Sequence, residues 1–161
     1  HNPGSNLKLA SGFAPLQALL HRGVSVGLGT DGAASNNNLD ILEEARLAAL
    51  IHKCTSGDPT AISANQALRL ATIEGAKVLG MDDQIGSLEV GKQVDLVLLN
   101  EDSPHLYPKH DIVSRLIYSA RASDVDMVLV AGKIVVQDGI AVTINRQEIM
   151  RQAQRIVEEI W

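Results

Sequence analysis

One stretch decides the fold of this chain: Gly27-Leu28-Gly29-Thr30-Asp31-Gly32-Ala33-Ala34-Ser35-Asn36-Asn37. The apolar run over residues 24–28 predicts a buried strand, and the glycines that follow permit a sharp turn. Asp31 therefore stands just past the C-terminal end of that strand, among small polar residues that can hydrogen-bond a carboxylate. In parallel α/β barrels catalytic groups gather at this rim, which makes Asp31 the first candidate for a functional residue.

The same residues also fit the Gly-x-Gly-x-x-Gly pattern of a dinucleotide-binding turn. That turn needs a helix that begins inside the motif, whereas the asparagines at positions 36–38 delay the next helix. The Asp31 carboxylate would face the phosphates, and no second strand that ends in an acid follows about 20 residues later. The dinucleotide interpretation is rejected, and a turn or helix-cap role for Asp31 remains as the alternative to a functional one.

A second glycine motif, GSLEVGK at residues 86–92, matches the start of a phosphate-binding loop. Gln93 stands where that loop needs a Ser or Thr hydroxyl for magnesium, and Glu89 would repel phosphate. The residues that follow predict a strand rather than a helix. We interpret this segment as a turn.

The first half of the chain predicts βα units. Helices are expected over residues 15–22, 39–53 and 63–79, with a loop over residues 54–62. Asn38 is the expected cap of the second helix, and Ser63 with Gln66 forms the capping box of the third.

The second half has a different pattern, with a boundary placed near Gly80 between domains 1–80 and 81–161. Strands are expected over residues 95–99, 125–130, 133–136 and 140–144, with a helix over residues 111–120. A last helix follows a cap formed by Asn145 and Glu148. Its apolar face consists of Ile149, Ala153, Ile156, Val157 and Ile160, and we expect this face to dock on an apolar surface.

Composition favours a globular cytoplasmic protein. The net charge of −5 offers no basic surface for nucleic acid or anionic lipid, and no apolar run reaches the roughly 20 residues of a membrane span. Cys54 is the only cysteine, which excludes an internal disulfide and a Cys-x-x-Cys zinc site and fits a reducing compartment. The chain opens on His1 within an expected loop, so we expect a fragment of a longer polypeptide.

Residues 1–15 (HNPGSNLKLASGFAP) and 29–37 (GTDGAASNN) resemble the amidohydrolase superfamily. The most similar branch is methylthioadenosine/S-adenosylhomocysteine deaminase, in the group that also holds chlorohydrolases and guanine deaminases. Residues 86–97 resemble the later Gly-Lys-x-Ala-Asp-Leu segment, with Val94 where alanine is usual. The resemblance implies an α/β fold: residues 1–80 would be the last βα units of a (β/α)8 TIM barrel, and residues 81–161 the C-terminal part of a small composite β-sandwich.

The resemblance also implies a site and a reaction. In this family the aspartate of Thr-Asp-Gly, here Asp31, follows the eighth barrel strand, binds one divalent metal, usually Zn²⁺, and transfers protons. Metal-activated water would then release ammonia from a purine nucleoside. Ser35 resembles a position that contacts the nucleoside, and His1 belongs to a motif at the mouth of the preceding strand, so we expect both to bind substrate beside Asp31.

The other metal ligands of that family have no counterpart in this sequence, which contains no His-x-His and no His-x-x-Glu. One carboxylate does not hold a catalytic zinc, which takes about three protein ligands. His21, His52, His105 and His110 are interpreted as surface residues. We therefore expect the remaining ligands to lie outside this chain, and the isolated chain neither to bind zinc tightly nor to deaminate.

Two alternatives to the deaminase remain open. One is another amidohydrolase, of the guanine deaminase or chlorohydrolase type, and the other is a non-catalytic scaffold or binding module. In each case the strand edges and the last helix would lack partners. We expect a homo-oligomer, or complementation by the upstream part of the polypeptide.

Overall fold

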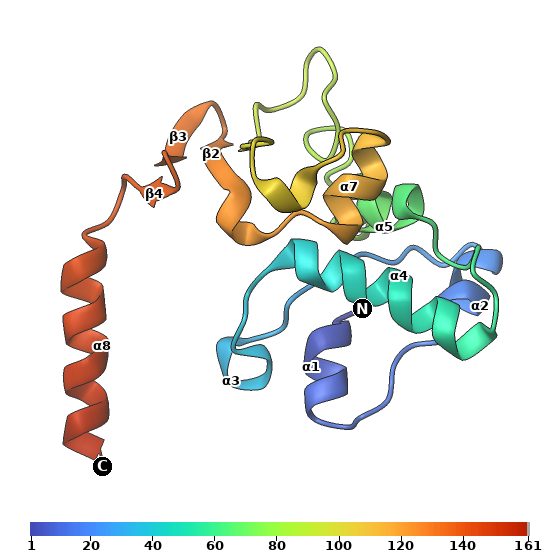
Figure 1. Cartoon of the computed structure of the whole chain (residues 1–161), viewed down its shortest axis with the longest axis horizontal. Helices are drawn as coiled ribbons and strands as arrows, with labels where there is room; N and C mark the ends of the chain where they lie inside the picture. Colours follow the sequence, from blue (N-terminus) through green and yellow to red (C-terminus); the bar gives the residue numbers. More distant parts are fainter. Residues whose placement is uncertain (161) are drawn as a thin grey trace.

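The computed structural model describes residues 1–160 and shows a helical body, a small sheet and one helix that stands apart (Figure 1). The elements are α1 (Pro3–Lys8), α2 (Leu16–His21), α3 (Ala33–Asn36), α4 (Ile41–Ser56), α5 (Ala64–Leu70), α6 (Ile73–Val78), β1 (Leu96–Leu99), η1 (Pro104–Leu106), α7 (Ile112–Tyr118), η2 (Ala122–Asp124), β2 (Val125–Val130), β3 (Lys133–Gln137), β4 (Ile140–Ala141) and α8 (Arg146–Ile160). The chain is therefore α/β, with its helices gathered around one core and a separate antiparallel sheet.

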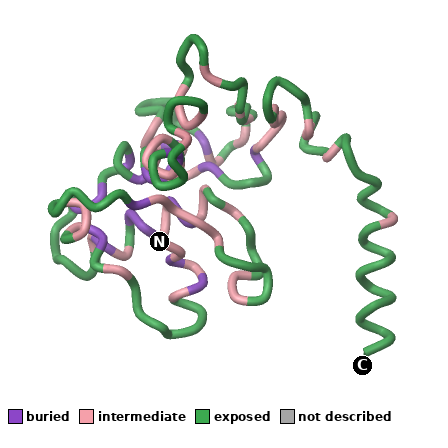
Figure 2. Tube along the Cα trace, turned by 180° about the vertical axis from the view of Figure 1, so that it is seen from behind, coloured by how far each residue is buried: buried purple, intermediate pink, exposed green. Residues whose placement is uncertain are grey.

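The core lies where α4, α5 and α7 pack against one another. Alanines on α4 let the neighbouring helices approach closely, and larger side chains fill the space between them. The fully or nearly fully buried members include Leu16, Ala45, Ala49, Ala67, Leu70 and Ile117. Figure 2 shows that buried residues are concentrated in this helical body and that α8 is exposed along nearly its whole length.

Helix α4 begins later than predicted and is capped by Asp40, so the prediction of Asn38 as the cap was wrong. The Asp40 carboxylate accepts hydrogen bonds from the backbone N–H groups of Leu42 and Glu43, the positions that an N-cap side chain can reach. The helix ends at Gly57, which adopts a left-handed conformation. It therefore includes the first residues of the predicted 54–62 loop.

The capping box of Ser63 and Gln66 is confirmed, but the predicted 63–79 helix is broken into α5 and α6. At the break, the Leu70 carbonyl accepts a hydrogen bond from the Leu28 N–H at 3.0 Å. Thr72 caps α6 with non-helical backbone angles. A long-range contact thus uses a carbonyl that a continuous helix would have bonded within itself.

The strand predicted over residues 24–28 is not formed among residues 1–160, and that prediction was wrong. Only Val26 of this segment is buried. A strand requires a neighbouring strand to pair with, and here only His1 pairs with the segment in that way. The His1 nitrogen donates to the Gly27 carbonyl, and the Gly29 N–H donates to the His1 carbonyl. One residue that bonds to two residues flanking its partner is the pattern of parallel pairing.

The four strands form one antiparallel sheet in the order β1-β2-β3-β4. β2 has the predicted bounds, β1 and β3 differ by one residue, and β4 is shorter than the predicted 140–144. Two hairpin turns join β2 to β3 and β3 to β4. Ala131-Gly132 and Asp138-Gly139 have positive φ angles, as two-residue turns between antiparallel strands require.

Helix α8 begins after Asn145, whose side chain accepts a hydrogen bond from the Glu148 N–H, so the predicted cap is present. No residue of α8 is buried, and Ile149, Ile156, Val157 and Ile160 are exposed. None of the helices within residues 1–160 combines the length and the apolar character needed to cross a membrane.

The docking of α7 on α4 and α5 can be tested with Ile117→Ala. Ile117 is fully buried, so its truncation should lower the free energy of unfolding by about 2–5 kcal/mol through lost burial and an unfilled cavity. Ile112→Ala on the same helix is the matched control, because Ile112 is 71% exposed. Urea titration measures both. Equal effects of the two substitutions would contradict the described packing.

Candidate functional site

Asp31 lies in the loop between residues 24–28 and α3, and both of its carboxylate oxygens are bonded. Oδ2 accepts a hydrogen bond from Ser5 Oγ at 2.7 Å, and Oδ1 accepts one from the Gly32 N–H at 2.7 Å. Asp31 has φ +62°, a left-handed conformation that aspartate tolerates better than most residues. The carboxylate is exposed, but its orientation is set by α1 on one side and by its own loop on the other.

These contacts hold the pKa of Asp31 below its ordinary value. The Ser5 hydroxyl contributes most, followed by the Ser35 hydroxyl and the Gly32 N–H, and these outweigh a small opposing effect of desolvation. Each donor stabilises the ionised form. Asp31 is therefore an anion at neutral pH, as a metal-binding carboxylate must be.

Ser35 lies beside Asp31, as predicted. It is on α3, its Oγ donates to the Gly32 carbonyl at 3.0 Å, and its hydroxyl is one of the groups that lower the pKa of Asp31. The structure thus brings Asp31 and Ser35 together within one short turn of chain.

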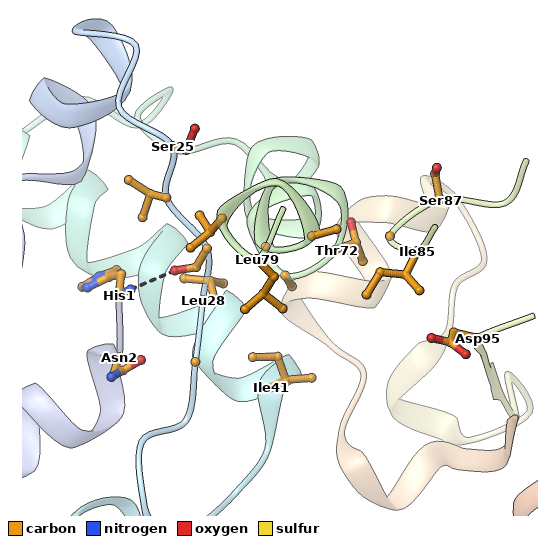
Figure 3. A pocket seen from close by; sticks show the side chains of 18 of the residues that line it. His1, Asn2, Ser25, Leu28, Ile41, Thr72, Leu79, Ile85, Ser87 and Asp95 are labelled. Atoms are coloured by element: carbon orange, nitrogen blue, oxygen red, sulfur yellow. Dashed lines mark hydrogen bonds between the residues drawn. The ribbon is translucent and has the colours of Figure 1, made fainter. Parts of the chain in front are cut away.

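His1 is placed differently. Its backbone pairs with Gly27 and Gly29, which anchors it next to the segment that leads to Asp31 (Figure 3). Its ring lies against the ring of His52, with the two Nε2 atoms 3.3 Å apart. Within residues 1–160 no hydrogen bond joins the His1 side chain to Asp31. His1 therefore shares the segment of the candidate site but contacts the helix behind it.

The interpretation of His52 as a surface residue was wrong. Its exposed fraction is 4%, its ring meets the edge of Phe13, and burial lowers its pKa. The spacing could have indicated this, because position 52 lies on the same helical face as the buried Ala45, Ala48 and Ala49. His21 and His110 are exposed as predicted, whereas His105 is partly buried and paired with Asp124 at 2.8 Å.

Sequence reasoning missed Ser5 and Glu44, both nearly fully buried at 2% and 1% exposure. Glu44, on α4, accepts hydrogen bonds from the Gly4 N–H and from the Asn36 side-chain amide. Ser5 lies inside the 1–15 motif that carries the family resemblance. That position was a possible signal that Ser5 contacts Asp31. Helical spacing distinguishes Glu44 from its neighbour Glu43, because only Glu44 lies on the face of Ala48 and His52.

A cavity of about 730 Å³ lies near the site but is not lined by Asp31. It runs along the segment from Ser25 to Gly29 and is closed on its far side by α6 and by residues 85–88 (Figure 3). Most of the lining side chains are apolar. The cavity therefore borders one edge of the segment that leads to Asp31 rather than the carboxylate itself.

The described residues offer part of a metal site. Within residues 1–160 no group of three His, Cys, Asp or Glu side chains is arranged to hold a metal ion. Asp31 has the required character: it is ionised, exposed and oriented, and the roughly four lone-pair sites of its carboxylate exceed its three hydrogen-bond donors, Ser5, Ser35 and Gly32. It fits the role of one ligand among several.

Comparison with known protein families matches residues 1–135 to the Amidohydrolase family. This chain belongs to the amidohydrolase family. One relative, the 5-methylthioadenosine/S-adenosylhomocysteine deaminase of Desulforudis audaxviator (strain MP104C), is 49% identical over 160 residues. The match covers 99% of this chain and 37% of the relative, so the chain spans little more than a third of the relative's length. The resemblance noted in residues 1–15 and 29–37 is confirmed.

Two solved structures are similar over nearly the whole chain. An adenosine deaminase from Xanthomonas campestris, crystallised with bound zinc, has a TM-score of 0.96 and 42% identity over 99% of this chain and 36% of that chain. The atrazine chlorohydrolase TrzN from Arthrobacter aurescens TC1, complexed with zinc, has a TM-score of 0.87 and 31% identity over 98% of this chain and 35% of that chain. The arrangement described above is thus shared by zinc-containing members of the family.

The contribution of Ser5 can be tested by Ser5→Ala. Loss of the hydroxyl should raise the pKa of Asp31 toward its ordinary value of 3.8, as followed by carboxyl ¹³C NMR. A carboxylate with a lowered pKa in the folded state stabilises the fold at pH values above its unfolded-state pKa. That stabilisation is lost as the pH falls through the folded-state pKa. In the variant the folded-state pKa lies nearer the unfolded-state pKa, so the pH range over which this stabilisation is lost should be narrower. Ser11→Ala, which removes an exposed hydroxyl, is the control. An unchanged Asp31 titration would contradict the assignment.

Proposed function

We propose that this chain supplies the C-terminal third of a metal-dependent hydrolytic deaminase that acts on a purine nucleoside of the methylthioadenosine or S-adenosylhomocysteine type. The observation that carries the proposal is the Asp31 carboxylate, ionised and fixed between Ser5 and Gly32 at the end of the segment that pairs with His1. The identity to a deaminase of that name supports the substrate class.

We further propose that residues 1–80 are the last βα units of a barrel and residues 81–161 the C-terminal part of a β-sandwich. The hydrogen bonds of His1 with Gly27 and Gly29 support the barrel proposal, because they follow the pattern found between neighbouring parallel strands. The antiparallel sheet β1–β4 supports the second unit.

In the proposed site Asp31 is the one metal ligand that this chain offers. A bound divalent metal, Zn²⁺ by analogy with the solved relatives, supplies Lewis acidity to the site. Asp31 can hold a proton at a free carboxylate lone pair and release it to a leaving amine. Ser35 stays a predicted contact to the nucleoside, a role that its position beside Asp31 supports.

Substrate binding by His1 and a cytoplasmic location both stay predictions. A substrate-binding role for His1 stays a prediction, because its ring contacts His52 rather than Asp31. A cytoplasmic location rests on the single Cys54, which suits a reducing compartment.

A chlorohydrolase is the second candidate, favoured by the similarity to the atrazine enzyme. Its identity to this chain is well below that of the deaminase, which is why deamination is preferred. A non-catalytic scaffold is the third possibility. Zinc binding with turnover would exclude the scaffold, and the leaving group, ammonia or chloride, separates the two enzymes.

Asp31→Asn tests the proposal in the complete polypeptide that carries this sequence. The wild type should bind one zinc and release ammonia from methylthioadenosine and S-adenosylhomocysteine, and the variant should lose about 100- to 10,000-fold in kcat because its amide neither carries charge nor accepts a proton. Asp138→Asn, in an exposed hairpin turn, is the control. The 161-residue chain alone should show neither property. Full activity in Asp31→Asn, or stoichiometric zinc and turnover in the chain alone, would contradict the proposal.

We also propose that the apolar face of α8 docks on a protein surface, so that the chain alone self-associates and the upstream part of the polypeptide covers this face when present. The exposure of its isoleucines supports this. Ile156→Glu should shift sedimentation toward the monomer, whereas Gln147→Glu, which adds the same charge at an exposed position outside the apolar face, should not. A compact monomer in the unmodified chain would contradict the expectation.

A further inference from the structure

Glu44 is a buried carboxylate that forms no salt bridge within residues 1–160, and the N-terminal ammonium of His1 acts on it only at longer range. Its exposed fraction is 1%, and within residues 1–160 no Lys, Arg or His side chain forms an ion pair with it. A charge removed from water is costly unless hydrogen bonds compensate for it. The hydrogen-bond donors that compensate for the buried charge of Glu44 are therefore strongly bound to it.

Both carboxylate oxygens of Glu44 accept hydrogen bonds, and they do so from different segments. Oε2 accepts from the Gly4 N–H in α1 at 2.9 Å, and Oε1 accepts from Asn36 Nδ2 in α3 at 2.8 Å. Asn36 Nδ2 also donates to the Thr30 carbonyl at 2.7 Å. One side chain on α4 thus connects the N-terminal helix to the loop that carries Asp31.

Glu44 reaches the Ser5–Asp31 hydrogen bond along two arms, one through Gly4 and one through Asn36 to Thr30. Each arm ends one residue away from that hydrogen bond. Gly4 precedes Ser5, whose hydroxyl donates to Asp31, and Thr30 precedes Asp31 itself. The donor and the acceptor of the Ser5–Asp31 hydrogen bond are therefore both held, through their neighbours, by Glu44.

The absence of a side chain at position 4 is part of the same arrangement. A Cβ atom on Gly4 would lie 2.2 Å from Glu44 Oε1 and 3.1 Å from Asn36 Nδ2, far inside contact distance. Any larger residue would displace the Glu44 carboxylate. Gly4→Ala should therefore disrupt the contact between Gly4 and the Glu44 carboxylate by steric overlap, without changing a charge.

We infer that Glu44 is a positioning residue for the candidate metal centre: it holds α1 and the 30–36 loop so that the Ser5 hydroxyl and the Asp31 carboxylate stay aligned. The inference rests on the proposed function, in which Asp31 is a metal ligand. Groups that orient a ligand in this way commonly change metal affinity by 10- to 100-fold when removed.

Glu44→Gln is the informative variant. The carboxylate accepts at both oxygens, whereas glutamine offers one acceptor and one donor, so either Gly4 or Asn36 would face another N–H group. The shape of the side chain is retained. Glu43→Gln is the matched control, because it makes the same change one residue away, where the carboxylate contacts Asn38 instead.

The experiment uses the complete polypeptide with three measurements: zinc affinity, kcat and KM for methylthioadenosine, and hydrogen exchange of the Gly4 amide in the zinc-free protein. Glu44→Gln and Gly4→Ala should weaken zinc binding about 10- to 100-fold and lower kcat with little change in KM. They should also speed Gly4 exchange in the zinc-free protein. Glu43→Gln should match the wild type in all three.

The following outcomes overturn the inference. One is wild-type zinc affinity and kcat in Glu44→Gln while Asp31→Asn loses both, which leaves the proposed function standing. Faster Gly4 exchange with unchanged zinc affinity would make Glu44 purely structural. Normal zinc affinity in Asp31→Asn would remove the proposed function and the inference together. Should Glu44→Gln fail to fold, Asn36→Ala removes the loop arm alone, and its unchanged zinc affinity would also overturn the inference.

Discussion

The hydrogen bond from Ser5 Oγ to Asp31 Oδ2 joins two parts of the chain that are 26 residues apart. It requires α1 to lie against the loop after residues 24–28, and that placement depends in turn on α4, which contacts α1 through Glu44. α4 is itself held by its buried alanine face against α5 and α7. The orientation of one exposed carboxylate is therefore the end of a series of contacts that starts in the core.

That series explains why the helices form a body without a completed sheet. Hydrophobic burial acts wherever apolar surfaces meet, and α4, α5 and α7 meet along their own faces. A strand has no such independence, because its N–H and C=O groups need a neighbour along their whole length. Residues 24–28 have a strand-like neighbour only at His1, and their other backbone hydrogen bonds are single contacts of Val24 with Leu19 and of Leu28 with Leu70, so no strand forms.

The features that could be predicted from the sequence are those made by residues close together in the chain, and the features that could not are those made by long-range contacts. The Ser63 capping box and the turns at Ala131-Gly132 and Asp138-Gly139 were predictable, because the residues that make them are adjacent in the chain. The break after Leu70 was not, since its cause is a hydrogen bond from Leu28. Asp31 was proposed as a site residue from local sequence, as the acid in a glycine-rich turn. Ser5 and Glu44 were not, because their roles exist only once α1, α3 and α4 are brought together.

The two kinds of carboxylate at this site show how one residue type serves opposite purposes. Asp31 is exposed and keeps free lone pairs, so it can bind a cation, whereas Glu44 is buried and uses both oxygens on N–H donors. A ligand that is already aligned loses less freedom when a metal binds, and the alignment must come from groups that do not themselves compete for the metal. Burial provides that separation: Glu44 lies behind α1 and the loop, where a cation would have to displace both of its hydrogen-bond partners to reach it.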